Sequence, residues 1–207
     1  MTIPGPTSVS TRESLAVRPS RPPDHAAENR ALGALLDVLA HEPAGILQAL
    51  ADAVLTLCRA ESAGLSLLER QGGHEVFRWV AVAGRYAPFA GTTLPRDESP
   101  CGVVIARDTL LVFRHPGAEY PALALADPPV GEALLAPFHV DGAPRATLWA
   151  VRHEECDGFD DEDARLLTRL AAFAAIALRL HDSVEALRES EARLRHTVEL
   201  SPHVPWT

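Results

Sequence analysis

The chain has 207 residues and a formal net charge of −9, and all 19 of its basic residues are arginine. An acidic chain without a basic patch argues against nucleic acid as a partner. Because lysine is missing, the chain has neither the lysine of a phosphate-binding P-loop nor one that could form a Schiff base.

The three cysteines, Cys58, Cys101 and Cys156, are an odd number at wide spacing, without a Cys-x-x-Cys pair. This pattern indicates neither a disulfide framework nor a zinc site, so we expect reduced thiols and no metal. The N-terminus has no apolar signal segment, and no run of about 18 apolar residues occurs. We therefore expect a soluble, cytoplasmic protein that does not bind membranes.

The first 24 residues are rich in Pro, Ser, Thr and Arg and offer little to bury, so we expect residues 1–24 to be a disordered tail. Two helices are predicted after it. The first, His25–Ala40, carries its leucines on one face. The second begins at Pro43, a residue that suits the first turn of a helix, and runs to about Arg59.

Strands and one short helix are predicted in the middle of the chain. A turn at Gln71-Gly72-Gly73 joins two strands into a hairpin. An irregular loop over residues 84–100 then leads to a short helix that has Ser99 as its N-cap. The elements expected here are the strands Ser62–Glu69 and Glu75–Ala83, the helix Pro100–Arg107 and the strand Thr109–Phe113.

A second long loop, residues 115–130, precedes two strands, Glu132–Val140 and Arg145–His153. Asp141-Gly142 between these strands is the strongest hairpin signal in the chain. Most strands are apolar on both faces and therefore need cover on both sides. The predicted fold is of the α+β class, with an antiparallel sheet of five to six strands, helices on one face and a long C-terminal helix.

The last long segment, Asp160–Leu200, has apolar residues at alternating steps of three and four, interrupted by Glu191. That period of 3.5 residues is typical of a coiled coil. At 1.5 Å per residue the helix would be roughly 60 Å long. We expect its first half to pack on the domain and its second half to form a parallel homodimer. The residues expected at the dimer seam are Leu180, Val184, Leu187, Leu194 and Val198.

The order of these elements, and several runs of residues, resemble a GAF domain of the kind found in bacterial multi-sensor signalling proteins, often histidine kinases. The resemblance covers about His25 to Leu180 and implies a sensory role. The departures from the family are informative: the NKFDE-type signature of cyclic-nucleotide-binding members is missing, and Gly102 follows Cys101 where bilin-binding members have His. The matching runs are 94–102, 113–116, Tyr120, 127–129, 134–140, 147–151, 153–154 and 159–167.

The segment 187–202 resembles the helix that opens a PAS domain, and Trp206-Thr207 would begin its first strand. We therefore divide the chain into a tail (1–24), a GAF domain (25–180), a coiled-coil linker helix (181–200) and the start of a truncated PAS domain (201–207). On this interpretation either the gene ends abruptly or the chain is an N-terminal fragment, and a catalytic output such as histidine phosphorylation would belong downstream of it.

The predicted function is that of a sensory input domain, not an enzyme. It would bind a small ligand or a partner and relay a conformational change through the C-terminal helix. One alternative is an enzyme similar to free methionine sulfoxide reductase, which would need at least two cysteines close to one pocket. Another is a scaffold that only dimerises. The sequence does not name a ligand or a cofactor.

The candidate ligand-binding residues come from the sheet and from the two loops beside the short helix. The aromatic ones could line a cavity for a planar ligand or simply fill the core. Cys101, at a helix N-terminus, could have a lowered thiol pKa or be a small buried hydrophobe. His115, Tyr120 and His139 could converge on a pocket or on haem iron, but no metal-ligand spacing supports this. The candidates are Trp79, Cys101, Phe113, His115, Tyr120, Phe138 and Trp149.

Overall fold

The computed structural model describes residues 9–153 and 158–199. The helices are α1 (Glu13–Ala16), α2 (His25–His41), α3 (Ile46–Leu57), α4 (Pro100–Arg107), α5 (Pro121–Ala124) and α6 (Asp161–Glu199). The strands are β1 (Val9–Thr11), β2 (Ser62–Gln71), β3 (His74–Gly84), β4 (Thr93–Pro95), β5 (Leu111–Arg114), β6 (Glu132–Val140) and β7 (Ala143–Arg152). Short 3₁₀ turns occur at Pro43–Gly45, Ala87–Phe89, Arg96–Glu98 and Pro116–Ala118.

All seven strands form one antiparallel sheet in the order β1-β5-β6-β7-β2-β3-β4. The predicted α+β class is confirmed, and the sheet is wider than expected because the short strands β1 and β4 extend its two edges. Both edge strands come from segments that were predicted to lack regular structure. Among the described residues, no helix is both long enough and apolar enough to cross a membrane.

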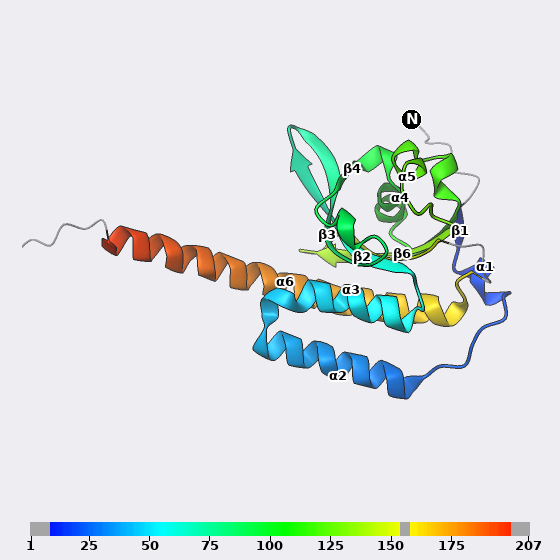
Figure 1. Ribbon diagram of the computed structural model, residues 1–207, viewed down its shortest axis with the longest axis horizontal. Coiled ribbons are helices and arrows are strands. Elements are labelled where there is room, and N and C mark those ends of the chain that lie inside the picture. The colour runs from blue at the N-terminus through cyan, green and yellow to red at the C-terminus, as the bar shows by residue number, and fades with distance from the viewer. Residues whose placement is uncertain (1–8, 154–157, 200–207) are drawn as a thin grey trace, which may run out of the picture.

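The two faces of the sheet are covered differently (Figure 1). Helices α3 and α6 pack on one face, and α2 lies outside them as a further layer. The short helices α4 and α5, with their loops, cover the opposite face. Successive residues of a strand point to opposite faces, so Leu134 and Leu148 belong to the helix-side core, whereas Leu135 and Trp149 belong to the other core.

The expectation of a disordered tail is wrong for residues 9–24. Strand β1 pairs with β5, and Leu15 is completely buried in the helix-side core. Arg18 forms a bidentate ion pair with Glu132, in which each guanidinium nitrogen lies 3.0 Å from a carboxylate oxygen. A guanidinium nitrogen of Arg21 lies 2.6 Å from a carboxylate oxygen of Asp163. The segment is ordered because Leu15 and the three arginines each meet a partner that is distant in the sequence.

Helix α6 begins with a reciprocal cap, in which the backbone N–H of Asp163 donates to Asp160 and that of Asp160 donates to Asp163. Such a pair satisfies two of the backbone donors that every helix start leaves unpaired. The first half of α6 packs on the sheet, and the second half runs well past the rest of the domain (Figure 1). Leu187 and Leu194 there are 61% and 64% exposed.

Candidate functional site

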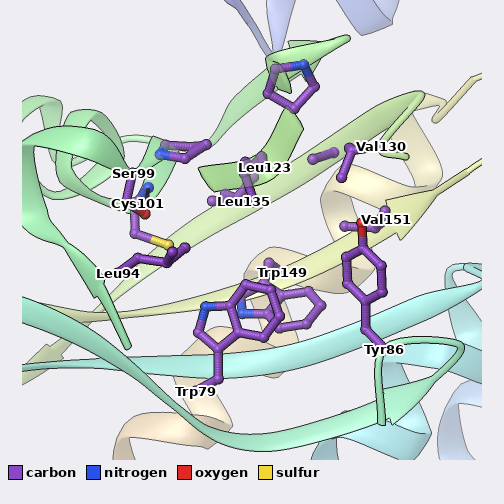
Figure 2. A pocket seen from close by; sticks show the side chains of 13 residues that line it. Trp79, Tyr86, Leu94, Ser99, Cys101, Leu123, Val130, Leu135, Trp149 and Val151 are labelled. Atoms are coloured by element: carbon purple, nitrogen blue, oxygen red, sulfur yellow. Dashed lines mark hydrogen bonds between the residues drawn. The ribbon is translucent and has the colours of Figure 1, made fainter. Parts of the chain in front are cut away.

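A small, partly open cavity lies between the sheet and the short helices α4 and α5 (Figure 2). Its volume is about 40 Å³, so a few heavy atoms would fill it in this conformation. The sheet and its edges contribute Trp79, Leu94, Ala133, Leu135, Trp149 and Val151. The covering segments contribute Tyr86, Ser99, Pro100, Cys101, Pro116, Leu123 and Val130.

Three aromatic rings form one side of the cavity. The ring centroids of Trp79 and Trp149 are 5.0 Å apart, and the ring of Tyr86 stacks on Trp79 with centroids at 5.9 Å. Trp149 fits because residue 64 is glycine: a Cβ atom there would lie 2.4 Å from the Trp149 ring. The Trp149 indole N–H donates to the Ser66 hydroxyl at 2.9 Å, which fixes the orientation of that ring.

The start of α4 forms the adjacent side. The Ser99 hydroxyl accepts from the backbone N–H of Cys101 at 3.2 Å and so caps the helix, as predicted. The Thr147 hydroxyl donates to the Cys101 sulfur, also at 3.2 Å. Burial nevertheless raises the pKa of the Cys101 thiol, against hydrogen bonds that lower it. The expected lowering at the helix N-terminus is therefore outweighed, and the thiol is protonated at neutral pH.

Tyr86 connects the cavity to a buried polar network. Its hydroxyl donates to the Pro128 carbonyl at 2.7 Å, and burial raises its pKa to about 12. Ser62 accepts from the Tyr86 backbone N–H and lies 2.7 Å from Nε2 of His153. Because the other ring nitrogen of His153 faces the carbonyl of Pro129 at 3.0 Å, that nitrogen carries the proton and Nε2 accepts from Ser62. Burial lowers the His153 pKa, which keeps the ring neutral.

The fold and this cavity can be compared with known proteins. A model of the GAF domain family matches residues 40–179. The chain belongs to the GAF domain family. Comparison with curated proteins finds no match.

Several solved GAF structures have a similar fold. The GAF domain of a phosphoenolpyruvate-protein phosphotransferase from Acinetobacter is 14% identical over 76% of this chain and 95% of its own, with a TM-score of 0.60. Free methionine-R-sulfoxide reductase from Neisseria meningitidis, solved with its substrate, is 20% identical over 82% and 99%, with a TM-score of 0.61. The second GAF domain of DevS from Mycobacterium smegmatis is 22% identical over 70% and 99%, with a TM-score of 0.56. At these identities the likeness establishes the fold alone.

The structure of this GAF domain brings together three of the seven predicted ligand-binding residues. Trp79, Cys101 and Trp149 line the cavity. Phe113 and Tyr120 belong to the same core and pack on each other with centroids 6.3 Å apart, but they do not line the cavity.

The other two predicted residues lie elsewhere. His115 is exposed on the loop after β5. Phe138 is buried in the helix-side core, because it lies three residues from Leu135 along β6 and therefore points to the other face. His139 is also away from the cavity, 3.1 Å from Asp108 on the surface. The predicted convergence of these histidines on one pocket is wrong, and no cluster of three potential metal ligands occurs among the described residues.

Cavity residues that the sequence analysis missed come mostly from the irregular segments. Tyr86 and Leu94 lie in the predicted loop 84–100, and Leu123 and Val130 lie in the loop 115–130. The apolar character of these loop residues was not a sufficient signal, because Leu125 in the second loop is 88% exposed. Leu135 and Val151 could have been found from strand alternation, because Leu135 pairs directly with Trp149 and Val151 is two residues beyond it.

The two described cysteines of this GAF domain are separated by the sheet. Cys101 lines the cavity, whereas Cys58 is completely buried in the helix-side core, where burial strongly raises its thiol pKa. Cys156 lies outside the described residues. Cys58 and Cys101 therefore cannot meet in one site without disrupting the sheet.

Proposed function

We propose that this GAF domain is a sensory input module that binds a small molecule in the cavity beside Trp79 and passes a conformational change to α6. The observation that carries the proposal is that strands β6 and β7 face the cavity on one side and α6 on the other. Leu135 and Trp149 line the cavity, and α6 packs on the opposite face of the same two strands. The cavity and α6 are thus separated by the thickness of one sheet.

A ligand in this cavity would act through these strands. A molecule larger than the present volume must displace side chains such as Leu135 or Trp149, and the tightly packed sheet passes such shifts to the surface on which α6 rests. The ligand changes the position of α6 only to the extent that it binds one arrangement more tightly than the other. The signal would then be a shift or rotation of the exposed half of α6.

The exposed half of α6 supports the further proposal that a second copy of this chain packs against it. Leu180, Leu187 and Leu194 are 37%, 61% and 64% exposed, and Val184 is partly buried. The fifth predicted seam residue, Val198, has its side chain outside the described part of the structure. A stripe of this kind favours association because apolar surface left in water costs about 25 cal/mol per Å². A parallel two-fold dimer would cover the stripe and place both domains at one end.

The broader setting is also part of the proposal. The resemblance of segment 187–202 to the helix that opens a PAS domain supports a longer protein in which α6 leads to further modules, with histidine phosphorylation as the output. Residues 200–207 lie outside the described part of the chain, so this part of the proposal depends on the sequence. On this view the catalytic step belongs to a downstream domain and not to the GAF domain itself.

The enzyme alternative, a free methionine sulfoxide reductase, has a similar fold in its favour. Reduction of a sulfoxide by two thiols needs both sulfurs within reach of one substrate. Cys101 lies in the cavity, but Cys58 is on the other face of the sheet. A turnover assay with free methionine sulfoxide and a thiol reductant separates the two functions: steady turnover would favour the enzyme, and its absence would favour the sensor.

The proposed function is tested by looking for a bound molecule. Native mass spectrometry of the freshly purified chain should reveal a small molecule that is retained by the wild type. Ala133→Leu, which adds a side chain to the cavity wall, should lose that molecule. Ala136→Leu, on the helix-side face of the same strand, is the matched control for damage to β6. If wild type and Ala133→Leu retain the same molecule, that molecule binds outside this cavity and the proposed site is wrong. If neither shows a ligand in thermal-shift screening, the ligand-free scaffold becomes the better interpretation.

A further inference from the structure

The polar atoms around the cavity include a hydrogen-bond donor that has no partner. Trp79 is only 8% exposed, yet its indole N–H donates to none of the described residues. The neighbouring donors are occupied: the Trp149 indole N–H donates to Ser66, and the Tyr86 hydroxyl donates to Pro128. The Trp79 nitrogen is not one of the fully buried atoms that lack a partner among the described residues, so solvent still reaches it through the cavity. A ligand acceptor placed there would take over a hydrogen bond that is otherwise left to water.

The direction of this N–H places it at the cavity. In Figure 2 the indole nitrogen of Trp79 lies on the edge of the ring turned toward the side where Leu94 and Cys101 lie. The start of α4 is on that side. The Ser99 hydroxyl accepts from the backbone N–H of Cys101 and also hydrogen-bonds to the Cys101 sulfur, so it is already occupied. The positive end of the α4 dipole also points to this region and favours an electron-rich atom.

The remainder of the lining determines the charge of the ligand. None of the residues that line the cavity is Arg, His, Asp or Glu. The nearby basic residues Arg96 and Arg114 form ion pairs with Glu75 and Glu132 instead. A full negative charge placed in this apolar space would have no cation to compensate the loss of its hydration. An acceptor atom on a neutral molecule can accept from the Trp79 N–H without that cost.

Resting on the proposed function of the cavity as a ligand site, we infer that its ligand is a small neutral molecule with one oxygen acceptor. The Trp79 indole N–H binds the acceptor, and the apolar remainder packs on the aromatic rings. A carbonyl group has this chemistry. The volume of about 40 Å³ limits the ligand to a few heavy atoms unless the walls move.

The test compares acetone with isobutene, which has the same shape but a CH₂ group in place of the carbonyl oxygen. Only acetone therefore carries a hydrogen-bond acceptor. Both are titrated into the ¹⁵N-labelled full chain, and the indole N–H signals are followed by NMR. Acetone should bind about fivefold more tightly, the effect of one neutral hydrogen bond. It should also move the Trp79 signal downfield, while the signal of Trp149, whose N–H is already bonded, moves less. Trp79→Phe removes the donor, keeps an aromatic ring and assigns the signal, and in this variant the preference for acetone should disappear.

The possible failures are distinct. If both probes bind wild type equally, or acetone saturates without moving the Trp79 signal, the inferred acceptor contact is wrong while the cavity remains a ligand site. If acetone keeps its preference in Trp79→Phe, the contact is likewise wrong. If neither probe moves any signal from the cavity residues, the proposed function of the cavity is overturned as well. The Trp79 signal of the wild type decides the question even if Trp79→Phe does not fold.

Discussion

Leu15 gives the sharpest test of whether the N-terminal segment belongs to the fold. It is completely buried in the helix-side core, although it comes from a segment whose composition predicts disorder. Replacing a buried Leu by Ala typically costs about 2–5 kcal/mol of unfolding free energy, through lost transfer energy and the cavity left behind. We expect about 3 kcal/mol for Leu15→Ala, because a segment at the edge of the domain can partly collapse into the space.

The same segment contains its own control. Val17 lies two residues away and is 85% exposed, so Val17→Ala should change the unfolding free energy by no more than about 0.5 kcal/mol. For a chain of this length, Leu15→Ala should lower the melting temperature by roughly 6–12 °C. Calorimetry or urea denaturation of both variants measures the difference. Equal stabilities for the two variants would show that the segment does not pack on the domain, and the predicted tail 1–24 would be restored.

Three further predictions concern the dimer, the aromatic wall and the buried histidine. Leu187→Ser combined with Leu194→Ser should convert a dimer into a folded monomer in sedimentation; a wild-type chain that is already monomeric at high micromolar concentration contradicts the dimer proposal. Gly64→Ala should displace the Trp149 ring, shift the tryptophan fluorescence and cost about 1–3 kcal/mol, whereas Gly33→Ala, which meets no atom within 4 Å, should be neutral or stabilising. Because burial lowers the His153 pKa below its ordinary value of 6.5, the unfolded chain binds more protons there, so stability should fall as pH drops through about 6.5. Urea titrations at several pH values should show that His153→Gln removes this part of the pH dependence, and an unchanged slope would refute it.

Local signals were sufficient for elements whose ends are set by nearby residues. The short helix α4 runs over Pro100–Arg107 as predicted, because Ser99 caps it and Asp108 ends it in the left-handed conformation. Strand β6 also has its predicted bounds, Glu132–Val140, since a hairpin turn follows it. In both cases the residues that decide the structure are adjacent in the sequence.

The N-terminal segment shows where local signals fail. Its ion pairs join Arg12 to Asp161 and Arg18 to Glu132, residues that are more than one hundred positions apart. Composition alone cannot reveal such partners, because the residues next to an arginine in the sequence do not show whether a distant carboxylate will pair with it. The segment has the low hydrophobicity that is typical of disorder. It is nevertheless ordered, because its single Leu is buried in the core and its arginines form ion pairs.

The candidate site was only partly predictable for a related reason. The aromatic residues were recognised as a group, but their side of the sheet was not worked out. Strand alternation and hairpin register together assign Trp149 and Leu135 to one face and Phe138 to the other. That register includes a shift between Phe138 and His139, which the turn sequence does not announce. Tyr86 was missed because no pattern links an aromatic residue in an irregular loop to a cavity.

The cover of the cavity is attached to the sheet more firmly than its composition suggests. On one side His153, directly after β7, hydrogen-bonds to the carbonyl of Pro129, and the Tyr86 hydroxyl joins Pro128 to a second covering segment. On the other side Cys101, at the start of α4, is bonded to Thr147 of β7. Polar contacts hold the covering segments in place, whereas only apolar contacts separate the cavity from α6 across the sheet. A ligand that needs more room would therefore displace the sheet side more easily than the covering segments. The apolar contacts across the sheet support α6, so in the proposed function the bonds that keep the cavity small would direct ligand-induced strain toward α6.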